Sequence, residues 1–235
     1  MLVDTTGKVI TQRQQPRMAL ISATPVPGGG IVLAAPGSAA LTVEVPEPRE
    51  TIDVLLHSSR LDVVEAARSA HAWLGGFLGT EVRLVHLDAP DRRRLINPAY
   101  ARPGETVSLA DGFPLLLTTL ASLDALNALI AQGDRPGEGP LPMDRFRPNV
   151  VVAGTAAWEE DGWSRLSIGD VTFRVVKPSA RCVITTTDQL TARRGAEPLR
   201  TLARHRRSGK ELLFGQNLIP DTSGVIRIGD PVRVL

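Results

Sequence analysis

The chain has 235 residues, a length that accommodates one large domain or two small ones. Hydrophobic residues make up 43% of it and charged residues 22%, which excludes an intrinsically disordered chain. The net charge of +2 gives no argument for nucleic-acid binding, and no apolar run reaches the roughly 18 residues of a membrane span. We therefore expect neither a nucleic-acid partner nor a membrane partner.

Cys182 is the single cysteine of the chain. One thiol excludes an intramolecular disulfide, a cysteine-based zinc finger and a four-thiolate iron–sulfur cluster. The segment that begins at Met1 has neither the basic stretch nor the apolar stretch of a secretory signal. These features predict a cytoplasmic protein.

The N-terminal part of the chain is typical of β-structure, because short apolar or alternating runs are separated by Pro, Gly and Asp. The expected strands are 2–3, 9–10, 19–21, 31–33 and 41–45. Apolar residues at helical spacing then predict an amphipathic helix over 63–78, with Asp62 as its N-cap and Gly79 just past its end. A further strand is expected at 82–85.

A loop that begins at Asp91 is the best candidate for a domain boundary, so we expect an N-terminal domain over 1–87 and a second domain over 92–235. The segments 166–173 and 225–232 share a strand, Gly-Asp turn, strand pattern, which predicts a tight hairpin in each. Many short strands with few helices indicate a fold that is mainly β with α (α+β) and contains a β-barrel. The other elements expected in the second domain are strands at 113–117, 150–152 and 183–187 and helices after Ser122 and at Glu197-Pro198.

The lone thiol is the first candidate for chemistry. Cys182 follows Arg181 at a transition from loop to expected strand, and a neighbouring guanidinium favours the thiolate, which is the form that binds soft metals. The alternative is a buried and inert cysteine, which is the commoner fate of a free thiol.

Two further segments could hold an anion or a polar heterocycle. Arg145, Arg147 and Asn149 precede a buried strand, and guanidinium groups bind phosphate oxygens in pairs. The alternative for these residues is a surface ion-pair patch with Asp144. A second set of hydroxyls precedes an expected helix, where free N–H groups bind anions, and ordinary helix capping is the alternative there: Thr118, Thr119 and Ser122.

Six motifs follow one another in the second part of the chain: Asp111-Gly112-Phe113-Pro114-Leu115, the segments 121–127, 145–149 and 160–163, Arg181-Cys182, and Phe214-Gly215-Gln216-Asn217. They have the order and spacing of MOSC-domain proteins (molybdenum cofactor sulfurase C-terminal domain), and residues 92–235 resemble this family. Leu2-Val3-Asp4, the segment 11–14 and Trp73-Leu74 stand in the first part of the chain. Through them, residues 1–87 resemble the β-rich N-terminal domain that precedes the MOSC domain in the amidoxime-reducing subfamily.

The resemblance implies a molybdenum–molybdopterin cofactor. It implies that Cys182 is the protein ligand of the metal and that Asp111 lies close to the metal as a second catalytic residue, which relays protons or positions the substrate. Cofactor-binding roles are expected for Arg147, Asn149, Arg145 and Arg181, and the chemistry of a helix N-terminus adds phosphate contacts from Thr118, Thr119 and Ser122.

The activity implied by the resemblance is the reduction of N-hydroxylated compounds, which are amidoximes, hydroxylamines and N-hydroxylated bases. Some relatives carry a ferredoxin domain with four cysteines, which a chain with one cysteine cannot form. We therefore expect electrons from a separate flavin or iron–sulfur reductase and no iron–sulfur cluster in this chain.

The sequence departs from its relatives at three places, one of which is Asp188-Gln189, where the family has Asp-Pro after the threonine run. The relatives carry an earlier strand with a lysine, and an arginine before the Leu-Val-Asp stretch, whereas this sequence begins at Met1; this predicts a truncated or misassigned start, or an incomplete cofactor pocket. Ser179 stands where many relatives have a second cysteine. Two other functions therefore stay open: a carrier of molybdenum cofactor or sulfur that uses Cys182, and a degenerate, non-catalytic member of the family.

Overall fold

The computed structural model describes residues 1–47, 50–89 and 94–235. The chain divides into two compact units. Unit 1 consists of Met1–Leu95, Thr106–Leu109 and Gln189–Arg193, and unit 2 consists of Ile96–Glu105, Ala110–Asp188 and Arg194–Leu235. The loop predicted from Asp91 begins outside the described residues.

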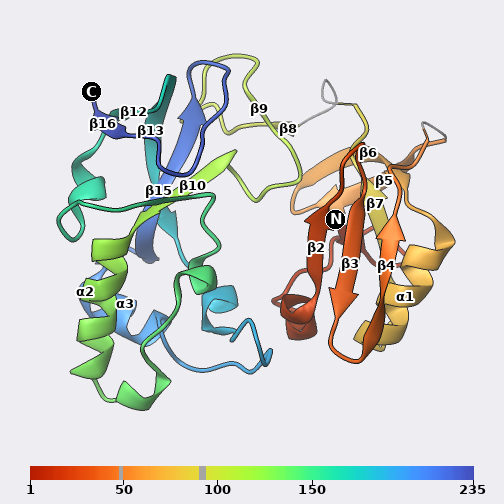
Figure 1. Cartoon of the computed structure of the whole chain (residues 1–235), viewed down its shortest axis with the longest axis horizontal. Helices are drawn as coiled ribbons and strands as arrows, with labels where there is room; N and C mark the ends of the chain where they lie inside the picture. The colour runs from red at the N-terminus through yellow and green to blue at the C-terminus, as the bar shows by residue number, and fades with distance from the viewer. Residues whose placement is uncertain (48–49, 90–93) are drawn as a thin grey trace. The chain divides into compact units, whose positions relative to one another are not determined.

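Unit 1 is built from short antiparallel strands and one helix (Figure 1). One sheet has the order β1-β7-β6-β5, a second has the order β2-β3-β4, and β8 pairs with β9. The elements are β1 Leu2–Val3, β2 Ser22–Pro25, β3 Ile31–Ala35, β4 Ser38–Val43, β5 Ile52–Leu56, β6 Ser59–Glu65, α1 Arg68–Leu78, β7 Arg83–His86, β8 Arg94–Leu95 and β9 Thr106–Val107.

Helix α1 buries one face against the strands of unit 1. Its buried side chains, Ala70, Leu74, Phe77 and Leu78, pack in one cluster with residues of β3 and β4. The helix ends as predicted at Gly79, whose φ of 71° is left-handed. The last turn of the helix therefore closes where the sequence places its glycine.

The predicted start of this helix is wrong. Val63 and Val64 lie in β6, where Val63 pairs with Ile52 of β5 and Val64 pairs with His86 of β7. Both valines are buried by these neighbours, so sheet pairing outweighs the helical spacing of the apolar residues. The strand expected at 19–21 is also wrong, because Pro16–Leu20 form a 3₁₀ turn.

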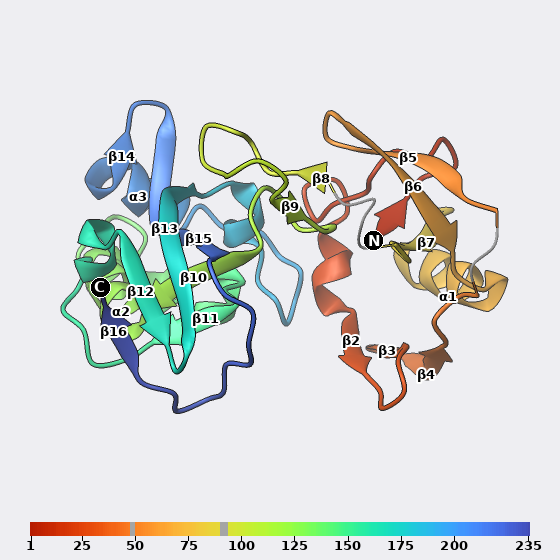
Figure 2. The ribbon, with the colours of Figure 1, turned by 90° about the horizontal axis from the view of Figure 1, so that it is seen from above.

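Unit 2 contains a bent sheet of seven strands that nearly closes into a barrel, with the order β11-β10-β15-β13-β12-β16 and β14 paired to β15 (Figure 2). Register shifts in the β13–β15 pair let these two 10-residue strands bend. The elements are β10 Leu115–Thr119, α2 Leu120–Ala131, η3 Pro136–Glu138, η4 Met143–Phe146, β11 Val150–Val152, η5 Glu159–Gly162, β12 Arg165–Ile168, β13 Val171–Ala180, η6 Val183–Thr186, α3 Leu199–His205, β14 Arg207–Ser208, β15 Glu211–Pro220 and β16 Val232–Val234.

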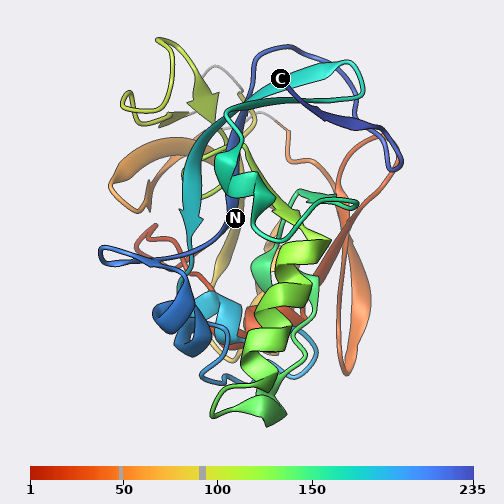
Figure 3. The same ribbon diagram turned by 90° about the vertical axis from the view of Figure 1, so that its left-hand side faces the viewer.

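Two clusters of buried side chains stabilise unit 2. One fills the interior of the sheet with residues such as Leu117, Leu166, Phe173 and Leu218. The other lies where α2 and α3 pack side by side at one end of the sheet (Figure 3). That cluster includes Phe146 of η4, so the segment around η4 is fixed to the hydrophobic core. The mainly β fold with α predicted from the sequence is confirmed.

The predicted hairpin at 166–173 is confirmed, because β12 and β13 pair around Gly169-Asp170. The hairpin predicted at 225–232 is wrong. Asp230 accepts a hydrogen bond from the Arg227 backbone N–H (2.7 Å), which closes a turn, and β16 then pairs with β12 instead of with the preceding residues.

The strand predicted at 183–187 is wrong as well. The hydroxyl of Thr185 donates to the carbonyl oxygen of Cys182 (2.8 Å), and that of Thr186 donates to the carbonyl oxygen of Val183 (2.9 Å). Such local bonds compete with a sheet ladder, and the segment forms the 3₁₀ turn η6.

Candidate functional site

Cys182 lies between the end of β13 and the start of η6. Its carbonyl oxygen accepts hydrogen bonds from both the backbone N–H (3.0 Å) and the hydroxyl of Thr185, so its backbone is fixed. The side chain is half-buried, with no disulfide partner. A thiol that is held in place and still partly exposed is able to bind a ligand from outside the chain.

Arg181 is tied to two points of the protein. One terminal nitrogen donates to the Ser179 hydroxyl (2.9 Å), the other donates to the Phe146 carbonyl oxygen (2.6 Å), and the guanidinium carbon lies 5.7 Å from the centre of the Phe146 ring. Burial lowers the pKa of Arg181 to about 10, the charges of Cys182 and Asp111 raise it, and that of Arg147 lowers it further.

Arg181 links the segments that carry two other predicted site residues, because it directly precedes Cys182 and donates to the carbonyl oxygen of Phe146, the residue before Arg147. The charge of Asp111 also acts on the Arg181 guanidinium. Asp111 is exposed in the irregular segment before β10. The neighbourhood therefore combines one thiol, one carboxylate and two guanidinium groups.

Arg147 ends η4 in a left-handed conformation, with a φ of 54° that is unusual for a residue with a side chain. Its side chain is exposed and makes no hydrogen bond or ion pair within the described ranges. Asn149 binds Leu116 of β10 through both its backbone N–H and its side-chain oxygen, each at 2.9 Å. This arrangement leaves the Arg147 guanidinium available to an anion.

Arg145 points the other way, into the protein. It is 9% exposed, and its terminal nitrogens donate to the carbonyl oxygen of Thr186 (3.2 Å) and to the carboxylate of Asp188 (2.8 Å). The ion pair that the sequence suggested with Asp144 is therefore replaced, for Arg145, by one with Asp188.

Thr119 and Ser122 lie at the start of α2 and are fully buried. Thr119 is the N-cap, since its hydroxyl accepts the backbone N–H of Ser122 (3.1 Å). Both hydroxyls also donate to one carboxylate oxygen of the buried Glu160, at 3.2 and 2.8 Å. The neighbouring Thr118 hydroxyl donates to the Met143 sulfur (3.2 Å). Their role as phosphate contacts stays a prediction.

Residues of the remaining motifs hold segments of unit 2 together. Gly215 has a φ of 81°, and a Cβ there would lie 2.6 Å from the Leu117 carbonyl oxygen, so only glycine fits this close approach of β15 to β10. Gln216 donates to Asp161 (2.9 Å), which also pairs with Arg206. These contacts hold η5, which carries Glu160, against β15.

Sequence reasoning missed the partners that organise the site. Asp188 and Glu160 are the acceptors for Arg145 and for the α2 hydroxyls, but neither was assigned a role. Each is a single carboxylate far along the chain from its partner. Glu160 stands inside the Glu-Asp-Gly-Trp motif and Asp188 follows the threonine run, but neither position indicated its partner.

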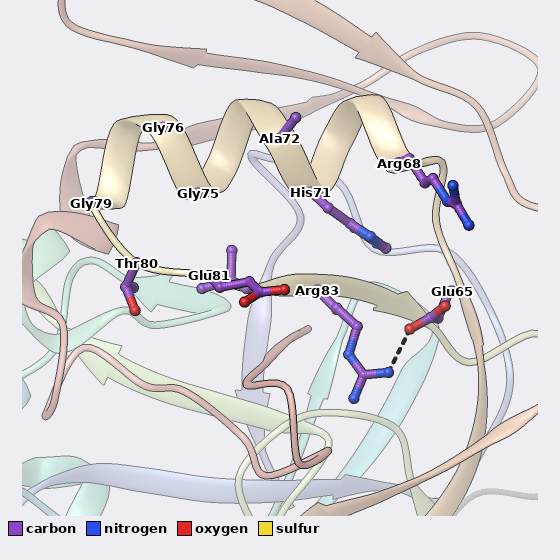
Figure 4. Close-up of a pocket in the computed structure, with 11 residues that line it drawn as sticks. Glu65, Arg68, His71, Ala72, Gly75, Gly76, Gly79, Thr80, Glu81 and Arg83 are labelled. Atoms are coloured by element: carbon purple, nitrogen blue, oxygen red, sulfur yellow. Dashed lines mark hydrogen bonds and ion pairs between the residues drawn. The ribbon is translucent and has the colours of Figure 1, made fainter.

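A separate hollow of about 730 Å³ lies within unit 1 between α1 and β7 (Figure 4). Gly75, Gly76 and Gly79 form its helix wall, and Arg83, which pairs with Glu65, lies on the opposite wall. None of the site residues predicted from the sequence lines it. Among the described helices, none has the length and apolar character to cross a membrane.

Comparison with known families agrees with this architecture. The model of the MOSC domain matches residues 104–233, and the model of the MOSC N-terminal beta barrel domain matches residues 1–81. The chain belongs to the MOSC-domain family.

Its relatives include mitochondrial amidoxime-reducing component 1 of Homo sapiens, which is 31% identical over an alignment of 250 residues in length. That alignment covers 100% of this chain and 72% of that protein. Mitochondrial amidoxime reducing component 2 is 33% identical in Rattus norvegicus, over 99% of this chain and 71% of that protein, and 34% identical in Homo sapiens, over 96% and 69%. A Bordetella bronchiseptica solution structure with a TM-score of 0.35 and 23% identity covers 40% of this chain and 75% of that one, too slight a likeness to bear on the fold.

Proposed function

We propose that this chain is a reductase of N-hydroxylated compounds that depends on a molybdenum–molybdopterin cofactor. The observation that carries the proposal is the neighbourhood of Arg181, which directly precedes Cys182 and donates to the carbonyl oxygen of Phe146, the residue before Arg147 (2.6 Å). The names of its relatives, which are amidoxime-reducing components, support the class of substrate.

The residues of this neighbourhood fit such a cofactor. A molybdopterin carries negative charge on its dithiolene and its phosphate, and the exposed guanidinium of Arg147 is a donor that no described protein group occupies. A single thiolate at Cys182 suits a metal whose other ligands come with the cofactor. Arg147 and Asn149 would hold the pterin, and Cys182 would bind the metal.

When bound, the cofactor supplies a two-electron couple that removes the oxygen of an N–O bond. The chain supplies the surroundings. Arg147 neutralises anionic groups at the site, Arg181 holds positive charge beside the thiolate of Cys182, and the exposed carboxylate of Asp111 carries protons to the substrate. Each turnover consumes two electrons and two protons and releases the N–H product and water.

The electrons come from a separate donor in this proposal. The 235 residues contain one cysteine, and a plant-type iron–sulfur cluster needs four. A flavin or iron–sulfur reductase is the class of partner that delivers electrons one or two at a time. Turnover of the purified chain with NADH as the sole reductant would contradict this part of the proposal.

The test compares wild type with Cys182→Ser, using reduced methyl viologen as an artificial donor and benzamidoxime as the substrate. We expect molybdenum content and turnover to fall at least about tenfold in the variant, because a thiolate ligand is lost. Equal melting temperatures show that the variant folds. Equal molybdenum content in both proteins would overturn the ligand assignment, and a metal-loaded wild type that reduces no benzamidoxime would favour a carrier.

A further inference from the structure

Two arginines, the half-buried Arg181 and the buried Arg145, link the same two segments in opposite directions. Arg181, from the segment that carries Cys182, donates to the carbonyl oxygen of Phe146 in η4 (2.6 Å). Arg145, from η4, donates to the carbonyl oxygen of Thr186 (3.2 Å), four residues after Cys182, and to Asp188 (2.8 Å). We call this set of bonds the arginine clamp.

The clamp rests on the hydrophobic core. Phe146 is fully buried and stacks on Phe214 of β15 with 4.0 Å between ring centroids. Since Phe146 lies between Arg145 and Arg147 in sequence, η4 presents one guanidinium inward and the next one outward. The packing of Phe146 in the core therefore fixes the backbone from which the side chains of Arg145 and Arg147 extend.

The bond between Arg145 and Asp188 is the ion pair of the clamp. The side chain of Arg145 is 10% exposed and that of Asp188 is 34% exposed. A buried guanidinium is costly unless it is paired, and a charge-assisted bond is stronger than one between neutral groups. The ion pair therefore has a defined geometry, and it restrains the position of the residues that follow Cys182.

We propose that Arg145 and Asp188 are positioning residues, which set the Cys182 thiol relative to the Arg147 guanidinium and do not touch the cofactor themselves. The proposal rests on the proposed function for the identity of the ligand that Cys182 and Arg147 share. The clamp itself is a property of the chain without cofactor.

Cofactor-free protein gives the first test, because Cys182 is the only cysteine and alkylation by iodoacetamide reports on it alone. Asp188→Asn removes the charge and keeps the shape, and Arg145→Gln removes the donor. We expect each variant to alkylate at least about threefold faster than wild type, because the released segment opens more often. The double variant should not exceed Arg145→Gln, since Arg145→Gln already removes the bonds to both Thr186 and Asp188. Arg200→Gln is the matched control, because it breaks an exposed pair with Asp134.

Cofactor-loaded protein gives the second test. If Asp188 positions the thiolate, Asp188→Asn shifts the electron paramagnetic resonance signal of the partly reduced metal and lowers kcat for benzamidoxime, with KM unchanged. A loss of overall stability alone would lower the yield of folded protein without shifting the signal.

The outcomes separate the two proposals. Alkylation rates equal to wild type in both Arg145→Gln and Asp188→Asn overturn the clamp, whatever Cys182→Ser does to the metal. If Arg145→Gln fails to fold, Asp188→Asn alone decides the matter. Faster alkylation in a protein whose Cys182→Ser variant keeps its molybdenum supports the clamp and overturns the proposed function.

Discussion

Two segments of unit 2 were expected to hold an anionic cofactor, and the structure fills them differently. At the start of α2, the hydroxyls of Thr119 and Ser122 donate to Glu160, which supplies an acceptor oxygen from within the chain. At the end of η4, the Arg147 guanidinium is exposed and has no hydrogen-bond or ion-pair partner within the described residues. The predicted anion site at the start of α2 is thus occupied by a carboxylate of the chain itself, whereas no described group binds the guanidinium at Arg147.

The difference teaches that residue types alone do not identify an anion site. The N-terminus of a helix attracts negative charge, and a carboxylate of the same chain satisfies it as well as a phosphate does. Glu160 lies 38 residues from Ser122 in the sequence, so local spacing could not reveal it. A phosphate at this place would compete with Glu160 for the hydroxyls of Thr119 and Ser122.

Replacement of Arg147 by Glu is the change with the largest expected effect. It places a negative charge where the proposal requires attraction, and we expect cofactor content to fall more than about tenfold, which corresponds to roughly 1.4 kcal/mol or more of lost binding. Molybdenum analysis of purified protein measures this. Arg227→Glu is the matched control, an exposed arginine of the same unit. Equal losses in both variants would remove the distinction between the two segments.

Glu160→Ala comes next and tests the other segment. Removal of the carboxylate leaves the buried hydroxyls of Thr119 and Ser122 without their acceptor, and we expect unfolding to become easier by about 2 kcal/mol. Urea denaturation measures this change, with the exposed Glu159→Ala as control. Molybdenum content per folded molecule should stay at the wild-type level. A loss as large as that of Arg147→Glu would show that α2 holds the cofactor after all.

Elements set by local chemistry could be predicted from the sequence. The turn at Gly169-Asp170 and the helix end at Gly79 follow from the conformations that these residues favour. Elements decided by distant partners could not. Val63 and Val64 have helical spacing, but strands β5 and β7 pair with them and bury them.

The site shows the same division. The motifs singled out Cys182, Arg147 and Asn149 as candidates, because each stands in a short run of characteristic residues, and their roles stay predictions. Asp188 stands out only as the first residue of Asp188-Gln189, where the family has Asp-Pro. Its partner Arg145 lies 43 residues earlier in the sequence, so local spacing could not pair the two. The inward direction of Arg145 was equally hidden, because it depends on the packing of Phe146 against Phe214.

Thr119→Ala sharpens the comparison at the level of a single hydrogen bond. The variant loses the N-cap of α2 and one of the two donors to Glu160, and we expect a destabilisation of about 1 kcal/mol. Thr119→Ser keeps the hydroxyl and should recover most of it in the same urea titration. If both variants match wild type, the cap does not contribute to the stability of α2.

Glu138, like Glu160, has a carboxylate that accepts hydrogen bonds from another segment of the chain. Its side chain is half-exposed, so it exchanges protons with the solvent. Its carboxylate accepts the backbone N–H groups of Ala196 (2.7 Å) and Glu197 (2.9 Å), and the bond from Glu197 is the main reason that its pKa lies below the ordinary 4.5. Because the folded pKa is depressed, the contribution of Glu138 to stability is complete above 4.5 and is lost as the pH falls through the lower, folded value.

Glu138→Gln should therefore cost about 0.5 kcal/mol at neutral pH and nothing in strong acid, since a protonated carboxyl and an amide accept equally poorly. Urea unfolding at a series of pH values measures the difference, and the exposed Glu44→Gln serves as control. We expect the stability curves of wild type and variant to converge below pH 4.5. Stability curves that stay parallel across the pH series would show that Glu138 is not charged in the folded protein. Its likeness to Glu160 would then be limited to the pattern of hydrogen bonds.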